Sequence, residues 1–541
     1  MTSTRTFQAE VTRSPSKVSP VGASTTPRLL PFHLADLLRH ERRFVWLLAG
    51  AVFVTLALLA TWIHPVEVPQ YENDRYHLQA ETLLSGSWPR DVYRPMLYVL
   101  LTAGLGWITG DCFLGGKLVS ALSIALLVVA THRLTRELHG RTSAITAAML
   151  IAVSPLAIRY GLVAGTDALF TATFTLALCA SIRAIRTIDL RSAAMAGFAF
   201  SLAYWSRYPA IVLLPVVLLG SALGARTGQR IWRASTCLAA AFVGLLPHMI
   251  LSWLQFGRPF YDENWRNVAL RHFSPTLDFG YLFNNPFHGL GSVLRHDPAL
   301  IMRHTIDEIA AMWNYGLRGV LAGPDSGPTL SAALFVLVLV SAMVSWTRRW
   351  KAALLLAIGT GSYLLLVATT FFTWERFLLP ALPPMLAMLA FALVRGIPRM
   401  VAIGNAHAFR SRLAIAAPAA IACALLWSAC VGADTLARQQ PLRAVEVARE
   451  LAQQTGSDVG IVSNYGFLSR HCPGRHHEIW IGSDPGISIA TQRPTQGAWH
   501  WLIASRTGMD DAAWRALDAI SEPWLQRVVD EPSVRAWRVV M

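Results

Sequence analysis

The polar stretch from Tyr71 to Arg94 lies between two apolar regions and concentrates groups that can do chemistry. Its ionisable residues are Glu72, Asp74, Arg75, His77, Glu81, Arg90, Asp91 and Arg94, in a chain that is only 15% charged. Asp74 is the first candidate, because a carboxylate held beside a membrane can accept a proton from an incoming hydroxyl group. That role contributes on the order of 10²–10⁴ in rate. The alternative is a solvated loop acid with no catalytic part.

A second acid, Asp167, stands in the sequence VAGTDALF at the predicted start of an apolar span. A charge costs about 2.5–3.5 kcal/mol at mid-membrane by insertion scales, so an acid in or beside a span is a functional candidate. The alternative is that Asp167 caps the helix that begins at Ala168, next to Thr166.

Three arginines are predicted to lie on the same side as these acids. Arg376 begins a span directly after Glu375, Arg207 stands in YWSRYPA, and Arg94 precedes Pro95 at the end of the polar stretch. The planar guanidinium suits phosphate oxygens, so we expect these arginines to hold an anionic lipid headgroup while the acids face an acceptor. For Arg376 the alternatives are a local pair with Glu375 or an extended position at the lipid headgroups.

Aromatic residues near these candidates are expected to line the site or to form an interfacial belt. The aromatic residues expected to line the site are Tyr76, Tyr98, Tyr208 and Trp374, and the acidic residue Glu375 is expected to line it with them. Tryptophans 88, 107, 205, 265, 313 and 374 are more typical of belt residues. The string HCPGRHH at 471–477 has no matching ligand spacing elsewhere, which favours a structural loop over a metal site.

Composition identifies the broad class. A chain of 541 residues that is 54% hydrophobic, with 19 tryptophans, is too apolar for a soluble multidomain protein and is predicted to be a polytopic membrane protein. The net charge of +15 comes from short basic clusters between apolar runs, a pattern that excludes a nucleic-acid-binding domain. The six scattered cysteines indicate neither a disulfide framework nor a metal knuckle.

About eleven apolar segments are long enough to count as membrane helices. They lie at 44–63, 115–131, 142–158, 166–182, 192–205, 209–225, 234–254, 329–346, 352–372, 377–394 and 413–433. Basic clusters fall at every second gap between them, which places those gaps and the N-terminus in the cytoplasm. The segment 96–109 is short and is predicted to be a helix on the outer face, because a span there would move every later cluster outside.

The domain organisation follows from the same reading. Residues 1–43 form a cytoplasmic tail, of which 1–28 are predicted to be disordered, and residues 44–433 form the membrane domain. Outer loops are expected at 64–114 and 255–328, the second one built of short helices. Residues 434–541 are predicted to be a small α/β domain on the outer side, with strands at 459–463, 478–481, 499–504 and 534–540 and helices at 442–454 and 511–520.

The ordered set of motifs resembles the GT-C fold membrane glycosyltransferases that use polyprenyl-phosphate sugars, in particular the protein O-mannosyltransferases and lipid A aminoarabinose transferases. Asp74, Tyr76, Ala80, Leu83 and Gly86 match the spacing of the family's first outer loop. Further matches are RPMLY at 94–98, RLTRELHGR at 133–141, Thr166-Asp167 and ERFLLP at 375–380, so that the resemblance covers roughly residues 44–395.

The resemblance implies that Asp74 is the base or acceptor-orienting acid, that Asp167 assists it, and that Arg94 and Arg376 bind the donor phosphate. It also implies an inverting transfer on the outer face of the cytoplasmic membrane, to a lipid, glycan or protein acceptor. Two departures stand out: Asp74-Arg75 replaces the family's Asp-Glu, which removes a second acid that would support a divalent metal, and Pro95-Met96 replaces Pro-Pro. The sequence itself supports no cofactor.

Two other functions remain open at this level. A transporter or lipid flippase would explain many spans, but it is more typical of broken helices at mid-membrane and internal repeats. A scaffold whose outer domain binds a partner would need no acids and arginines beside the spans. Convergence of Asp74, Asp167, Arg94 and Arg376 on one place would favour sugar transfer.

Overall fold

The computed structural model describes residues 40–63, 76–89, 93–224, 226–274, 285–313, 317–322, 328–371, 375–396, 416, 418–427, 430, 443–456, 459–464, 468, 472, 474–478, 499–506, 509, 511–520 and 522–540. The predicted disorder of residues 1–28, the positions of Asp74 and Trp374, and the predicted domain boundary near 434 all lie outside these ranges.

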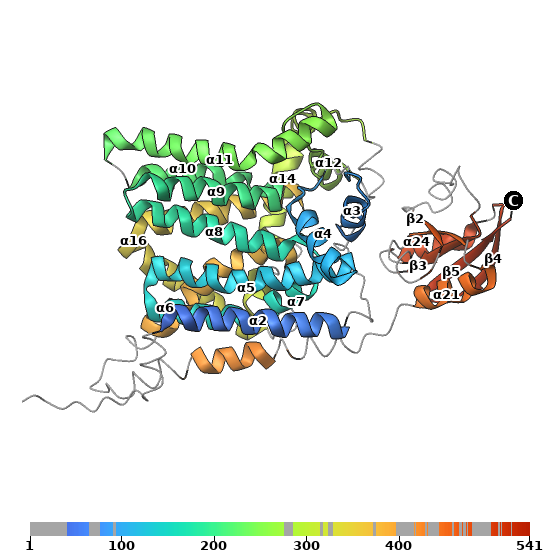
Figure 1. The fold of residues 1–541 in the computed structure, drawn as a ribbon, viewed down its shortest axis with the longest axis horizontal. Helices are drawn as coiled ribbons and strands as arrows, with labels where there is room; N and C mark the ends of the chain where they lie inside the picture. Colours follow the sequence, from blue (N-terminus) through green and yellow to red (C-terminus); the bar gives the residue numbers. More distant parts are fainter. Residues whose placement is uncertain are drawn as a thin grey trace, which may run out of the picture. The chain divides into compact units, whose positions relative to one another are not determined.

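The membrane domain is a set of long apolar helices (Figure 1). Its main helices are α2 (Glu41–Ile63), α5 (Cys112–His139), α8 (Thr166–Arg186), α9 (Leu190–Ser206), α10 (Leu213–Leu223), α11 (Thr227–Phe256), α16 (Pro328–Thr370) and α18 (Leu382–Phe391). Within α16, a kink at Arg349 separates two helices. Six segments of the described chain are long and apolar enough to cross a membrane: 41–62, 112–139, 166–186, 227–256, 349–370 and 375–395. Each of the eleven segments predicted from the sequence contains helix.

Some predicted spans are bent or short. Helices α6 (Arg141–Ala152) and α7 (Pro155–Leu162) together form a candidate span with a 52° bend. The bend has a local cause, since Ser154 caps α7 and Pro155 lacks the N–H group that would continue the hydrogen bonding of α6. Shorter apolar helices occupy 97–109, 208–223, 332–347 and 418–427. The first of these is α4 (Leu97–Thr109), at the place where the sequence predicts a short helix.

Four helices lie side by side (Figure 1). Helix α5 packs against α8, α8 against α9, and α9 against α11. Small residues allow the closest approach. A Cβ atom at Gly197 on α9 would lie 2.0 Å from the carbonyl oxygen of Cys237 on α11, so only glycine fits there. Close backbone contact of this kind is how helices associate in a bilayer, where no hydrophobic force drives them together.

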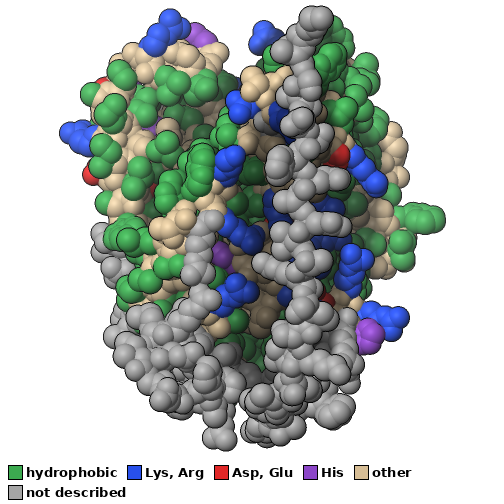
Figure 2. Space-filling view, turned by 90° about the vertical axis from the view of Figure 1, so that its left-hand side faces the viewer, with side chains coloured by type: hydrophobic (Ala, Val, Ile, Leu, Met, Phe, Trp, Pro, Cys, Tyr) green, Lys and Arg blue, Asp and Glu red, His purple; other side chains and the backbone are tan. Residues whose placement is uncertain are grey.

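One end of the helix bundle gathers basic side chains. In Figure 2, Lys and Arg side chains are spread over this end and acidic side chains are few. Arg186 and Arg349 belong to separate clusters that the sequence places in the cytoplasm, and both contact Glu137 near the end of α5. Arg186 donates to the carboxylate of Glu137, and Arg349 donates to the backbone carbonyl of Glu137. The clusters that the sequence places on one side of the membrane therefore meet at one end of the fold.

At the other end, short helices precede α5 and follow α11. They are α3 (Tyr76–Leu84), α12 (Trp265–Phe273), α13 (Leu290–His296), α14 (Pro298–Ala311) and α15 (Leu317–Ala322). The prediction of short helices within 255–328 is confirmed for the described part of that segment. A buried cluster of Val268, Ala269, Phe287 and Val293 joins α12 to α13.

The C-terminal part contains a five-stranded sheet in the order β2-β1-β3-β5-β4. The strands are β1 (Gly460–Ser463), β2 (Arg475–Glu478), β3 (Trp501–Ser505), β4 (Leu525–Asp530) and β5 (Val534–Val539), and β1 runs parallel to β2 and β3 while β5 is antiparallel to β3 and β4. The sequence missed β4 because its LQRVVD pattern is weakly apolar. Of the strand predicted at 478–481, only Glu478 lies within the described residues, and it is the last residue of β2.

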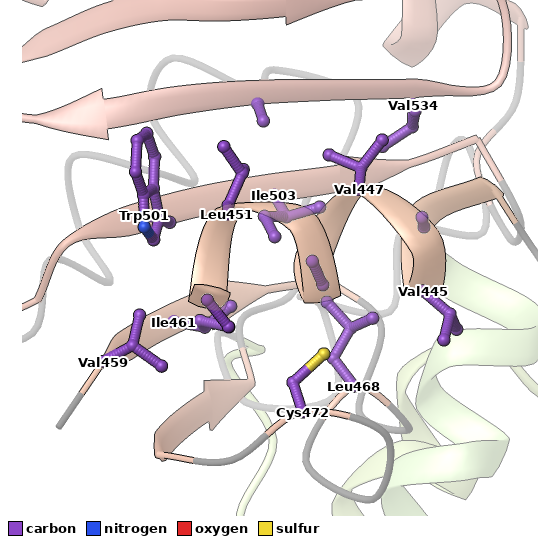
Figure 3. Close-up of a cluster of buried hydrophobic side chains, with 14 of the residues drawn as sticks. Val445, Val447, Leu451, Val459, Ile461, Leu468, Cys472, Trp501, Ile503 and Val534 are labelled. Atoms are coloured by element: carbon purple, nitrogen blue, oxygen red, sulfur yellow. The ribbon is translucent and has the colours of Figure 1, made fainter. Parts of the chain in front are cut away.

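Helices cover both faces of this sheet. On one face, α21 (Arg443–Thr455) turns Val447 and Leu451 toward Ile461 and Ile503 (Figure 3). On the other, Trp514 and Leu517, from α24 (Asp511–Ala516) and the following 3-10 turn, pack with the alternate strand residues Val462, Leu502, Ala504 and Trp537. The period-two alternation of the strands thus supplies two small apolar cores.

Candidate active site

A buried ion pair joins Asp167 to Arg207. Asp167 lies in the first turn of α8 with 3% of its surface exposed, and its Oδ1 accepts a hydrogen bond from Nη1 of Arg207. The N-cap residue of α8 is Gly165, so the side chain of Asp167 pairs with a distant arginine and does not serve as the cap that the sequence offered as an alternative.

Arg207 reaches this position because α9 ends one residue earlier. Its backbone is extended, with φ −158° and ψ 137°, and the chain then enters a short 3-10 turn, η1 (Tyr208–Val212), with Pro209 in its first residues. The guanidinium lies 5.9 Å from the ring centre of Phe170 and 5.1 Å from that of Phe377. Aromatic faces and a carboxylate together hold the cation at the ends of α8 and α9.

The ring of Phe377 carries a second arginine. The guanidinium carbon of Arg376 lies 4.5 Å from the ring centre, so one buried aromatic side chain contacts both Arg207 and Arg376. Glu375 pairs across the fold with Arg159 on α7, at 2.9 Å, and this pair is partly exposed. Glu375, for which the sequence suggested a local pair with Arg376, thus has a long-range partner on α7.

The polar stretch 71–94 contacts the start of α8 through Tyr76. Its hydroxyl lies 3.3 Å from Oγ1 of Thr166, the neighbour of Asp167, and its ring stands edge-on to Tyr98 at 5.1 Å. The guanidinium of Arg94 lies 5.1 Å from the ring centre of Tyr76. Because Tyr76 begins α3 only two residues after Asp74, the described part of the loop leads to the start of α8.

Tyr98 fixes the helix that follows Arg94. Its hydroxyl donates a 2.7 Å hydrogen bond to the carbonyl of Gly116 on α5 and lies 3.2 Å from the Ser120 hydroxyl, which in turn donates to the carbonyl of Gly165. The side chain is fully buried. A hydrogen-bonded chain thus runs from α4 through α5 to the residue that precedes α8.

Other predicted lining residues lie further from the ion pair. Tyr208 belongs to an aromatic group with Tyr204 and His248, at ring distances of 5.4 and 5.7 Å. Among the predicted belt residues, Trp88, Trp107 and Trp313 are exposed, as a membrane-interface position requires. Trp265 instead lines a cavity.

Sequence reasoning did not select three residues in this region as site residues. Lys117 on α5 is 5% exposed, and its ammonium nitrogen lies 4.4 Å from the ring centre of Phe113. The ring of His77 meets the same phenylalanine edge-on at 5.4 Å. A lysine just inside an apolar run was a usable signal, because ionisable groups within spans are rarely incidental. Tyr363 on α16, packed 5.6 Å from Phe170, offered no such signal.

The described residues hold no group of three or more His, Cys, Asp or Glu side chains arranged to bind a metal ion. The candidate site consists of charged and hydroxyl groups. It contains the buried carboxylate of Asp167, the guanidinium groups of three arginines and the side chains of two tyrosines, Tyr76 and Tyr98. Such a site can bind an anion and orient a hydroxyl group.

Comparison with known proteins finds one family match and several similar folds. Residues 93–253 match the family model described as dolichyl-phosphate-mannose-protein mannosyltransferase, a stretch that includes Arg94, Asp167 and Arg207. The fold is similar to that of ArnT from Cupriavidus metallidurans, solved in the apo state, with a TM-score of 0.58 at 13% identity, covering 90% of this chain and 97% of that one.

The same ArnT bound to undecaprenyl phosphate gives a TM-score of 0.56 at 14% identity over 90% of this chain and 97% of that one. The chain has the GT-C fold. The oligosaccharyltransferase AglB from Archaeoglobus fulgidus, in complex with an inhibitory peptide and a dolichol phosphate, is also similar, with a TM-score of 0.51 at 14% identity over 84% of this chain and 69% of that one. No curated protein matches the chain by sequence.

The similarity to these structures confirms the fold class expected from the sequence. The match to a mannosyltransferase family model over residues 93–253 agrees with the expected enzyme class. The family match covers residues 93–253 and so includes neither Asp74 nor Arg376. The catalytic role predicted for Asp74 and the donor-binding role predicted for Arg376 therefore stay predictions.

Proposed function

We propose that this glycosyltransferase moves a sugar from a polyprenyl-phosphate donor to a hydroxyl group of an acceptor, with inversion at the sugar's anomeric carbon. The observation that carries the proposal is the contact series from Arg94 through Tyr76 and Thr166 to Asp167, and from Arg207 through Phe377 to Arg376. It gathers acid and arginine side chains from four separate parts of the chain.

The arginines are assigned to the donor phosphate. The guanidinium groups of Arg94 and Arg376 each lie over an aromatic ring, Tyr76 and Phe377 respectively, which orients them. The guanidinium of Arg207 has five N–H donors. Its hydrogen bond to Asp167 uses an N–H group of Nη1. Its proposed part is therefore twofold: it compensates Asp167 and presents its remaining donors to the phosphate.

The acids are assigned to the acceptor side. In the proposed step the acceptor oxygen attacks the anomeric carbon, and the bond from that carbon to the phosphate oxygen breaks with its electron pair on the phosphate. Asp74 takes the acceptor's proton as the new bond forms. An ordinary aspartate with a pKa near 3.9 suffices when the hydroxyl loses its proton late, because the arginines stabilise the departing charge.

The membrane location supports the same scheme. Basic side chains gather at the end of the bundle opposite to Asp167 and Arg376, which fits a cytoplasmic position for that end (Figure 2). We place the site at the outer face of the cytoplasmic membrane, with the N-terminus inside and the C-terminal α/β domain outside. Lipid, glycan and protein acceptors all supply a suitable hydroxyl group.

The test supplies membranes that contain the protein with polyprenyl-phosphate donors, each radiolabelled in its sugar. We expect one donor to be consumed and its label to move to an acceptor, and we expect Arg376→Gln to abolish most of this transfer. Arg395→Gln is the matched control, since Arg395 ends the same candidate span at its other end. Consumption of no donor by the wild-type protein would overturn the proposal, as would equal activity of the two variants.

A further inference from the structure

A cavity outside the ion-paired site lies between the end of α11 and the start of α13. Its volume is about 440 Å³, within the range of about 300–1,000 Å³ that is typical of small-molecule sites. One wall is formed by residues 258–266 and the other by residues 285–289. We refer to it as the loop cavity.

The loop cavity combines aromatic faces with fixed polar groups. Phe260, Tyr261, Trp265 and Phe287 supply the aromatic lining. The hydroxyl of Tyr261 donates a 2.6 Å hydrogen bond to Glu263, and Nε of Arg266 lies 2.8 Å from the other carboxylate oxygen of Glu263. The hydrogen bond to Glu263 raises the pKa of Tyr261, so this hydroxyl stays protonated. The polar wall is therefore held rigidly.

This lining favours one kind of ligand. The two carboxylates, Asp262 and Glu263, balance the two guanidinium groups, Arg258 and Arg266, and Arg266 already pairs with Glu263, so the lining has no excess of positive charge for a phosphate. A purely apolar ligand would remove these charged groups from water without compensation. A saccharide has hydroxyl groups that both donate and accept hydrogen bonds, together with apolar C–H faces that stack on aromatic rings. Its chemistry matches carboxylates, arginines, an amide from Asn285 and Trp265 in one cavity.

The walls of the loop cavity contact the residues around the transfer site. Asn264 donates from Nδ2 to the carbonyl of Tyr93, the residue before Arg94, at 3.3 Å. Phe260 packs against Tyr204 at 6.4 Å between ring centres, and Tyr204 packs against Tyr208, which follows Arg207. A ligand held in the cavity therefore lies beside both arginine-bearing segments.

We propose that the loop cavity binds the saccharide part of the acceptor, so that this enzyme extends or decorates a glycan. The inference rests on the proposed sugar transfer, because it assigns the acceptor of that reaction. It also makes Trp265 and Asn285 acceptor-binding residues, distinct from Arg376 and Arg94, which contact the donor.

Direct binding is the first test. Purified full-length protein in lipid nanodiscs is mixed with methyl α-D-mannopyranoside, methyl β-D-glucopyranoside or N,N′-diacetylchitobiose, and saturation-transfer NMR records which sugar protons contact the protein. We expect at least one of these probes to bind and Trp265→Ala to weaken it about tenfold. Trp232→Ala, at an exposed tryptophan near the other end of α11, is the control and should leave binding unchanged.

Trp265 also packs against the cluster of α12 and α13, so a second variant separates binding from folding. Trp265→Phe keeps an aromatic face and is expected to retain most of the binding, whereas Asn285→Ala, which removes a polar wall group, is expected to lower it. Failure of all three sugars to bind the wild-type protein overturns the inference. Inorganic phosphate that displaces a bound sugar in a ³¹P NMR titration overturns it as well.

The two proposals fail in different ways. A protein that consumes a polyprenyl-phosphate donor but binds none of the three sugars retains the proposed function and loses the glycan acceptor. A protein that binds a sugar at Trp265 but consumes no donor retains the cavity assignment and loses the transfer reaction. For the active enzyme, Asn285→Ala should raise the acceptor KM and leave the donor KM unchanged.

Discussion

Asp167 and Arg207 form a buried ion pair between the first turn of α8 and the end of α9. The two residues are adjacent in space because α8 and α9 are antiparallel neighbours, so the start of one meets the end of the other. The pair fixes where the carboxylate and the guanidinium stand before any substrate arrives. Such positioning is the main contribution a phosphoryl-linked sugar requires from an enzyme.

Removing one partner of this pair is expected to destabilise the protein. Asp167→Asn leaves the Arg207 charge buried without its counterion, at a cost of about 3–5 kcal/mol, and transfer activity should fall with it. The double variant Asp167→Asn with Arg207→Met should regain thermal stability in detergent while it remains inactive. A double variant no more stable than the single one would contradict the prediction.

Asp74→Asn is expected to give a protein that inserts and folds but transfers sugar on the order of 10²–10⁴ more slowly. The amide has nearly the same shape as the carboxylate but cannot take the acceptor's proton. Asp91→Asn, a change of the same kind in the same polar stretch, serves as the control and should keep most of the activity. The measurement is label transfer in membranes with equal amounts of each variant, and normal transfer by Asp74→Asn would remove this residue from the mechanism.

Arg376→Lys is expected to weaken donor binding even though the charge is kept. Lysine lacks the planar fork that bonds two phosphate oxygens and packs on the Phe377 ring less well. A lost charge-assisted hydrogen bond is worth about 1.5–3 kcal/mol, which corresponds to a donor KM raised roughly 10- to 150-fold. The acceptor KM should not change, and a change confined to the acceptor would contradict the assignment.

Phe377→Leu should reduce activity with a smaller loss of stability. Leucine fills most of the buried volume but offers no aromatic face to Arg207 or Arg376, and each such contact is worth about 0.5–2 kcal/mol. The donor KM should rise because both guanidinium groups lose orientation. Phe391→Leu, on the same span but stacked near His139 at 4.4 Å, is the control for the packing loss alone.

Tyr98→Phe is expected to lower stability by about 1–3 kcal/mol, because it leaves the buried Gly116 carbonyl without the hydroxyl donor. The loss should appear in thermal unfolding in detergent. Donor KM should stay close to the wild-type value if Tyr98 acts by joining α4 to α5, whereas a large rise would show that the hydroxyl contacts the donor.

The membrane helices and the side on which their ends lie could be predicted from the sequence, because local composition decides both. A run of about twenty apolar residues forms a helix in a bilayer, since each backbone group must find its partner within the segment. The alternation of basic clusters then predicts which ends share a side, and the clusters at Arg186 and Arg349 indeed meet at Glu137. Acids and arginines beside the predicted spans identified Asp167, Arg207, Arg376 and Arg94 as candidates.

The tertiary structure alone decided which of these candidates touch. No local pattern shows that Arg207 pairs with Asp167, that Glu375 pairs with the distant Arg159, or that one phenylalanine ring contacts two arginines. The loop cavity likewise depends on two walls brought together by the packing of α12 on α13. The sequence by itself determined which groups carry charge at the membrane face. Their partners were decided only by packing, because charge selects a partner through distance in space, which spacing along the chain does not encode.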